Sequence, residues 1–124
     1  MQTILLVDDD REILSYLEYT LASAGYNVIP KVDALTALHA IQEEINIDLV
    51  ITDYSMPGMD GHEFFREVKK VLPSVPVIMI TGHASVESYV KSLNLGLYEY
   101  ICKPIDTALL HRIVKKALVR PEVQ

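Results

Sequence analysis

Residues 3–10 have the sequence Thr-Ile-Leu-Leu-Val-Asp-Asp-Asp, in which an apolar run passes directly into three carboxylates. The run over residues 3–7 is rich in leucine and β-branched residues and is too short for a helix, so it predicts a buried strand. Apolar residues then recur with helical spacing from Arg11 to Ala24, and Gly25 is typical of a residue that follows a helix end. The inward face of this helix is predicted to hold Ile13, Leu14, Leu17, Leu21 and Ala24.

The same strand-and-helix unit recurs along the rest of the chain. Further strands are predicted at residues 26–29, 48–52, 77–80 and 100–102. Helices are predicted after the N-cap Asp33, over residues 62–72 and 86–95, and after the N-cap Asp106. The residues expected to face inward from these helices are Ala34, Leu35, Leu38, Ile41, Phe64, Phe65, Val68, Leu109, Leu110, Ile113, Val114, Ala117 and Leu118.

Strict alternation of strands and helices predicts an α/β protein with a parallel sheet covered by helices on both faces, because crossover connections are right-handed. A closed barrel needs eight such units and about 250 residues, whereas this chain has 124 residues. The sequence therefore predicts a (βα)5 doubly wound, five-stranded sheet of the flavodoxin-like order 2-1-3-4-5, forming one domain over residues 1–124.

Composition excludes several classes of function. Eleven Lys and Arg against 17 Asp and Glu give a net charge of −6, which disfavours direct binding to nucleic acid. The single Cys102 cannot form an internal disulfide and is expected to be a small buried strand residue in a protein of a reducing compartment. Neither a signal peptide pattern nor an apolar run of ~20 residues is present, so we expect a soluble cytoplasmic domain without membrane contact.

Polar side chains follow four of the predicted strands where each strand ends. Asp8, Asp9 and Asp10 follow the first strand, and the third, fourth and fifth strands lead into Asp53, Thr81 and Lys103. Because ligands of open parallel sheets bind beyond the carboxyl ends of the strands, these side chains are expected to meet at one edge. Asp10 is expected to cap the following helix, which leaves Asp8 and Asp9 near Asp53.

Two carboxylates ~4 Å apart repel by about 4 kcal/mol at an effective dielectric constant near 20. Such a cluster favours a hard cation, and a small number of oxygen ligands suits Mg²⁺. Each residue also has an ordinary structural use: Asp53 can begin a turn, Thr81 can end a strand, and Lys103 can be solvated. Their coincidence at one edge of the sheet favours a metal-assisted, phosphate-handling site, although it does not by itself name the reaction.

Five segments resemble one known family over essentially the whole chain. Leu6-Val7-Asp8-Asp9-Asp10 closes the first strand and Asp48-Leu49-Val50-Ile51-Thr52-Asp53 closes the third. The other three segments are Met56-Pro57-Gly58-Met59-Asp60-Gly61, Thr81-Gly82 and Tyr100-Ile101-Cys102-Lys103-Pro104. In this order and register, they resemble the receiver domain of two-component response regulators, and of chemotaxis regulators in particular.

The resemblance implies that Asp53 accepts a phosphoryl group from the phosphohistidine of a sensor histidine kinase or a histidine phosphotransfer protein. It implies that Mg²⁺ is held by Asp8, Asp9, Asp53 and the backbone carbonyl of Ser55. Thr81 and Lys103 would contact the phosphoryl oxygens, with Thr81 and Tyr100 acting as switch residues. The signal would then leave through the surface of the fourth helix, fifth strand and fifth helix, toward an output domain or a second copy of the chain. The only chemistry expected is the domain's own phosphorylation and dephosphorylation.

Other polar residues are weaker candidates. Ser55 and His83, each two residues beyond a site residue, would influence an attacking water if the family geometry holds. His39, His62 and His111 lie on separate predicted helices without metal-ligand spacing and are expected at the surface. The basic residues Arg112, Lys115, Lys116 and Arg120 suit a solvated helix end or a partner contact.

Three other functions were weighed against the receiver interpretation. A haloacid-dehalogenase-like phosphatase also uses an Asp-x-Asp after the first strand, but it usually has Thr or Val where Arg11 stands and it needs no acid after the third strand. A flavin mononucleotide site is disfavoured because three aspartates would repel the phosphate. A receiver-like interaction module that is not controlled by phosphorylation is the remaining alternative, although such modules typically lack one of the five site residues present here.

Overall fold

Strands and helices alternate along the computed structural model, which describes residues 1–43, 46–82 and 86–119, without the side chains of residues 86–88. The strands are β1 (Thr3–Val7), β2 (Asn27–Lys31), β3 (Leu49–Asp53), β4 (Val77–Thr81) and β5 (Glu99–Cys102). The helices are α1 (Arg11–Ser23), α2 (Ala34–Gln42), α3 (Gly61–Val71), α4 (Val86–Asn94) and α5 (Thr107–Leu118). The predicted (βα)5 order is confirmed.

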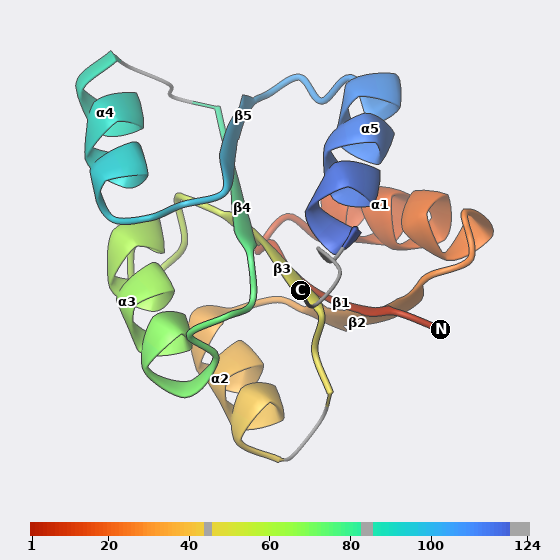
Figure 1. Ribbon diagram of the computed structural model, residues 1–124, viewed down its shortest axis with the longest axis horizontal. Helices are drawn as coiled ribbons and strands as arrows, with labels where there is room; N and C mark the ends of the chain where they lie inside the picture. The colour runs from red at the N-terminus through yellow and green to blue at the C-terminus, as the bar shows by residue number, and fades with distance from the viewer. Residues whose placement is uncertain (44–45, 83–85, 120–124) are drawn as a thin grey trace, which may run out of the picture.

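The strands form one sheet in the order β2-β1-β3-β4-β5, and every neighbouring pair is parallel. This is the predicted doubly wound arrangement, seen in Figure 1 with helices on both sides. The register aligns Val7 with Thr52 and Asp53 with Ile80, so the residues after β1 and at the end of β3 lie beside each other. Thr81 of β4 pairs with Cys102 of β5, which places Lys103 at the same edge of the sheet.

Alternate strand residues supply two separate apolar cores. Leu5, Val7 and their neighbours pack under α2 and α3, and Ile4 and Leu6 pack under α1 and α5. Figure 1 shows these two groups of helices on opposite sides of the sheet. Because successive side chains of a strand point to opposite faces, a continuously apolar strand fills both cores at once.

Aspartate side chains begin four of the helices. Asp10, Asp33 and Asp106 accept hydrogen bonds from the first free backbone N–H groups of α1, α2 and α5, as predicted. Asp60 does the same for α3, accepting from the N–H of Glu63 at 2.9 Å. Among the described helices, none combines the length and the apolarity that crossing a bilayer requires.

Several predicted details were wrong. β2 continues through Pro30 to Lys31, because an edge strand tolerates a residue without an N–H group. On α2 the prediction favoured large side chains, but Leu35 is 63% exposed, and Ala37 and Ala40 are buried in its place. Ala24, at the C-cap of α1, and Leu109 are also exposed.

For two further residues, Cys102 and His62, the predicted burial was wrong. Cys102 is exposed rather than buried, because it is the last residue of the edge strand β5. His62 is only 3% exposed rather than at the surface, because its position on α3 places it with Phe65 on the buried side of the helix. His39 is exposed as predicted.

The loop from β3 to α3 is tied back onto the sheet. The N–H of Tyr54 donates to the carbonyl of Ile80 at 2.8 Å, and the N–H of Gly61 donates to the carbonyl of Tyr54 at 2.8 Å. A Cβ atom at Gly61 would lie 2.8 Å from Cδ1 and 2.9 Å from Cα of Tyr54. Glycine at this position therefore lets the first turn of α3 approach the residue that follows Asp53.

We predict that Gly61→Ala lowers the free energy of unfolding by about 1–3 kcal/mol, because the added methyl group overpacks against backbone. Gly82→Ala is the matched control, since the nearest atom to its Cβ position lies 4.0 Å away. Urea denaturation of both variants measures the difference. Equal stability of the two variants would show that the close approach to Tyr54 is unimportant.

Candidate functional site

Three carboxylates meet at the carboxyl edge of the sheet. One carboxylate oxygen from each of Asp8, Asp9 and Asp53 lies within 4.8 Å of the others. Asp8 is 2% exposed and Asp53 is 6% exposed, whereas Asp9 is open to solvent. The parallel pairing of β1 with β3 produces this meeting, since it places the ends of the two strands side by side.

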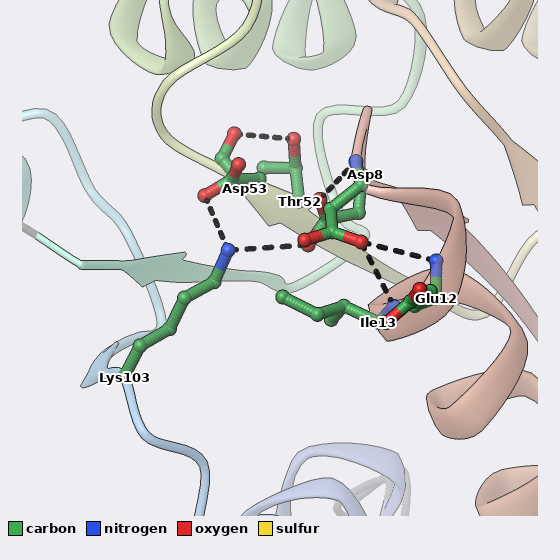
Figure 2. Close-up of polar contacts among 7 residues, drawn as sticks. Asp8, Glu12, Ile13, Thr52, Asp53 and Lys103 are labelled. Atoms are coloured by element: carbon green, nitrogen blue, oxygen red, sulfur yellow. Dashed lines mark hydrogen bonds and ion pairs between the residues drawn. The ribbon is translucent and has the colours of Figure 1, made fainter.

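Lys103 reaches both buried carboxylates. Its Nζ atom lies 3.4 Å from Oδ2 of Asp8 and 3.5 Å from Oδ1 of Asp53, as Figure 2 shows. The side chain starts beyond β5 and crosses the end of β4, where the Lys103 N–H donates to the Thr81 carbonyl at 2.7 Å. One ammonium group therefore faces two carboxylates. The peptide bond between Lys103 and Pro104 is cis.

Backbone and hydroxyl groups hold the two aspartates further. The N–H of Asp10 donates to Oδ1 of Asp8 at 2.9 Å, and the hydroxyl of Thr52 donates to the backbone carbonyl of Asp53 at 3.0 Å. Asp10 accepts hydrogen bonds from the N–H groups of Glu12 and Ile13, so it caps α1 as predicted. Asp8 and Asp9 are left to face Asp53.

Burial raises the pKa of Asp8 and of Asp53 above their usual value. For Asp53 the neighbouring charge of Asp8 raises the pKa further, and Lys103 opposes the rise at both residues. The ionised cluster is therefore under net electrostatic strain. A bound cation would relieve this strain, and carboxylate oxygens are the ligands that hard cations prefer. The donor set thus fits a metal ion.

The remaining predicted site residues, Thr81, Ser55 and Tyr100, differ in how deeply they are buried. Thr81 is completely buried at the end of β4, and Ser55 is exposed in the loop after Asp53. Tyr100 is 8% exposed, and its ring meets the ring of Tyr89 edge to face, with the centroids 5.8 Å apart. His83 lies outside the described residues.

Beside β5 the surface is hollowed between the strand and α5. Arg112, Lys116 and Tyr98, with Glu99, line a cavity of about 490 Å³ whose floor includes Leu109 and Ile113. Of the predicted basic run, Arg112, Lys115 and Lys116 are exposed, whereas Arg120 lies outside the described residues. The charges can be predicted from the sequence but the hollow cannot, because the hollow depends on how α5 packs beside β5.

Comparison with known proteins identifies the family. The model of the response regulator receiver domain matches residues 4–115. The chain belongs to this family. The phosphatase and flavin-site interpretations are therefore set aside, and the receiver interpretation of fold and function is confirmed. Phosphorylation on an aspartate is the general function of receiver domains, which are signalling domains of two-component systems.

Curated relatives are transcriptional regulators. The chain is 37% identical over 115 residues to the transcriptional regulatory protein GlrR of Escherichia coli, covering 93% of this chain and 26% of GlrR. It is 33% identical to the C4-dicarboxylate transport transcriptional regulatory protein DctD of Rhizobium meliloti, again covering 93% of this chain and 25% of DctD. The chain therefore spans about a quarter of the length of these relatives.

Solved receiver domains share the whole fold. A response regulator receiver domain from Clostridium thermocellum has a TM-score of 0.89 at 32% identity, with 95% of this chain and 94% of that chain covered. A CheY-like receiver domain from Methanospirillum hungatei has a TM-score of 0.89 at 36% identity, with the same coverage.

We predict that Asp53→Asn stabilises the metal-free protein at pH 7 by about 1 kcal/mol or more, because it removes one of two mutually repelling buried charges. When the pKa of a carboxyl is raised in the folded state, its ionisation lowers the free energy of unfolding as the pH rises. The stability gained by Asp53→Asn should therefore vanish in acid, where Asp53 is protonated in both the folded and the unfolded state. Asp10→Asn is the control, since Asn caps a helix equally well. Urea denaturation in EDTA measures both, and a destabilised Asp53→Asn would contradict the prediction.

Proposed function

We propose that Asp53 is the phosphoacceptor and that its phosphoryl donor is the phosphohistidine of a sensor histidine kinase or a histidine phosphotransfer protein. The observation that carries the proposal is the contact of Lys103 with both Asp8 and Asp53. This contact brings together a nucleophilic carboxylate, a second carboxylate and an ammonium group at the carboxyl ends of the strands, where ligands of this fold bind.

In the proposed reaction, a carboxylate oxygen of Asp53 attacks the phosphorus atom of the donor. The phosphorus–nitrogen bond breaks, the imidazole leaves, and an acyl phosphate forms on Asp53. Lys103 supplies a positive charge to the phosphoryl oxygens, and the hydroxyl of Thr81 is a further donor. The acyl phosphate is later hydrolysed, and Ser55 and His83 are candidates to influence the attacking water. We assign the domain no other catalytic activity.

Mg²⁺ is the metal that we assign to the acidic cluster. Asp8, Asp9, Asp53 and the backbone carbonyl of Ser55 would hold it, and the three carboxylate oxygens within 4.8 Å support this assignment. When bound, Mg²⁺ offsets the negative charge that the incoming phosphoryl group adds beside the aspartates.

Incubation with acetyl phosphate and Mg²⁺ should add one phosphoryl group to the wild-type chain and none to Asp53→Asn. Intact-mass spectrometry measures the change. Asp60→Asn, which alters an exposed carboxylate after the same strand, should be labelled like wild type. Asp9→Asn should need more Mg²⁺, because one metal ligand is lost from an exposed position that does not support folding. Equal labelling of Asp53→Asn would reject the assignment.

The proposed switch begins when the phosphoryl group adds about −1.5 to −2 charges at Asp53. Thr81 would move toward the new acceptor oxygens and leave room beside β5. Tyr100, whose ring is apolar and whose tip is polar, could then change its position over that space. A change of about 1.4 kcal/mol shifts a two-state ratio tenfold, so a few hydrogen bonds suffice.

We propose that the surface of α4, β5 and α5 transmits the signal to an output domain or to a second copy of the chain. Lys91, Tyr98 and Arg112 are exposed candidates for partner contacts there, and the side chain of Glu87 lies outside the described part. Residues 1–124 are proposed as one receiver domain that acts in the cytoplasm, without direct contact to nucleic acid or membrane. The greater length of the regulators that it resembles supports an attached or associated output.

Chemical-shift mapping with beryllofluoride, a phosphoryl mimic, tests the switch. Wild type should show large changes over α4 and β5, and Thr81→Ala should show changes near Asp53 with much smaller ones over α4. Thr52→Ser is a control, because it keeps the hydroxyl that bonds to the Asp53 carbonyl and should retain the wild-type pattern. Changes over α4 that survive in Thr81→Ala would exclude this route.

A further inference from the structure

A buried polar pair joins α3 to α4. Nε2 of His62 lies 2.9 Å from the hydroxyl oxygen of Ser92, and these residues are 3% and 1% exposed. Among the residues that the structure describes, Nδ1 of His62 has no hydrogen-bond partner. The pair is thus held by one hydrogen bond, and a ring protonated on both nitrogens would have no acceptor for its Nδ1–H group among these residues.

This pair lies beside Tyr54, the first residue of the loop that follows the proposed phosphoacceptor. The ring of Tyr54, the residue after Asp53, meets the His62 ring edge to face with the centroids 4.9 Å apart. Three residues before Ser92, α4 carries Tyr89, whose ring packs against the ring of Tyr100. Helix α4 is therefore held near one point by His62 and near another by the proposed switch tyrosine (Figure 1 shows α4 beside α3).

The surroundings of His62 favour its neutral form. The charged groups that face it are Lys91 on α4, Arg66 on α3, and Asp60 at the start of α3. Burial is the main reason that the pKa of His62 lies below its usual value, and Lys91 and Arg66 lower it further against the opposing effect of Asp60. The remaining facing group is the phenol of Tyr54, whose pKa is raised by burial and which therefore stays neutral in mild acid.

We propose that His62 and Ser92 form a pH-sensitive latch, which holds α4 against α3 while His62 is neutral and releases α4 when His62 takes up a proton. The protonated ring would carry an N–H group on each nitrogen, and only Nε2 has a hydrogen-bond partner among the described residues. The result would be a buried cation with an unsatisfied Nδ1–H group between two packed helices. Separation of α4 from α3 would expose that cation to water. His62 is thus a positioning residue of α4.

The sign of the effect follows from proton linkage. A histidine whose pKa is lowered in the docked state contributes stability that is fully present above its ordinary pKa and is lost as the pH falls below it. Acid would therefore loosen the helix that the proposed phosphorylation switch also moves. This functional consequence rests on the proposed function, whereas the latch itself does not and is tested without phosphate.

Hydrogen–deuterium exchange of the α4 amides at pH 7.5 and pH 5.5, corrected for intrinsic rates, tests the latch. In wild type, exchange should be up to about tenfold faster at the lower pH, because one histidine with an ordinary pKa near 6.5 protonates in the released state. In His62→Gln, which keeps a polar side chain but does not titrate, the dependence should be absent. His39→Gln, at an exposed histidine of α2, is the matched control and should behave like wild type.

Two further measurements do not depend on the folding of His62→Gln. In wild type, the nuclear magnetic resonance titration of the His62 ring should have a midpoint below the ordinary histidine value of about 6.5, and the α4 amides should titrate with the His62 midpoint. Ser92→Ala should accelerate α4 exchange at pH 7.5 by about fivefold or more, because a buried hydrogen bond is lost. The latch is refuted if α4 exchange is independent of pH in wild type, if the dependence survives in His62→Gln, or if the His62 midpoint is not below about 6.5.

Discussion

The carboxylates of Asp8 and Asp53 repel each other where two parallel strands end, and much of the surrounding structure opposes that repulsion. The pairing of β1 with β3 forces the two groups together, and burial prevents water from screening them fully. Lys103 reaches both from β5, and the N–H of Asp10 holds Asp8 in place. The pKa of each carboxyl is nevertheless raised, so the site remains short of positive charge. A bound cation would supply the charge that the site lacks.

The same topology separates chemistry from signalling. Asp8, Asp53 and Lys103 lie at the end of the sheet, whereas α4 packs on one of its faces beside α3. Any influence of the site on α4 must pass through packed groups between them. Tyr54 touches His62, and Tyr100 touches Tyr89, so two contacts connect the strand ends with this helix. Both run on the side of the sheet covered by α2, α3 and α4.

Most of the acidic site could be predicted because its placement needs only two simple regularities. Period-2 and helical patterns locate the strand ends, and parallel strands bring those ends to one edge. Asp8, Asp9, Asp53 and Lys103 are therefore brought together by the order of the elements alone. The resemblance to receiver domains added roles for Thr81, Tyr100 and Ser55 that no local pattern could supply.

What the sequence could not settle was burial on individual helices and at strand ends. Leu35 is exposed while Ala37 and Ala40 are buried, because burial on α2 depends on which face of the helix a residue occupies and not on the size of its side chain. Cys102 is exposed because it is the last residue of the edge strand β5, and His62 is buried because α3 packs against α4 there. The sequence by itself determined the element order, the sheet and the acidic edge, since these follow from local periodicity and handedness. Only the tertiary structure decided which helix faces meet, because that depends on the combined shapes of side chains far apart in the chain.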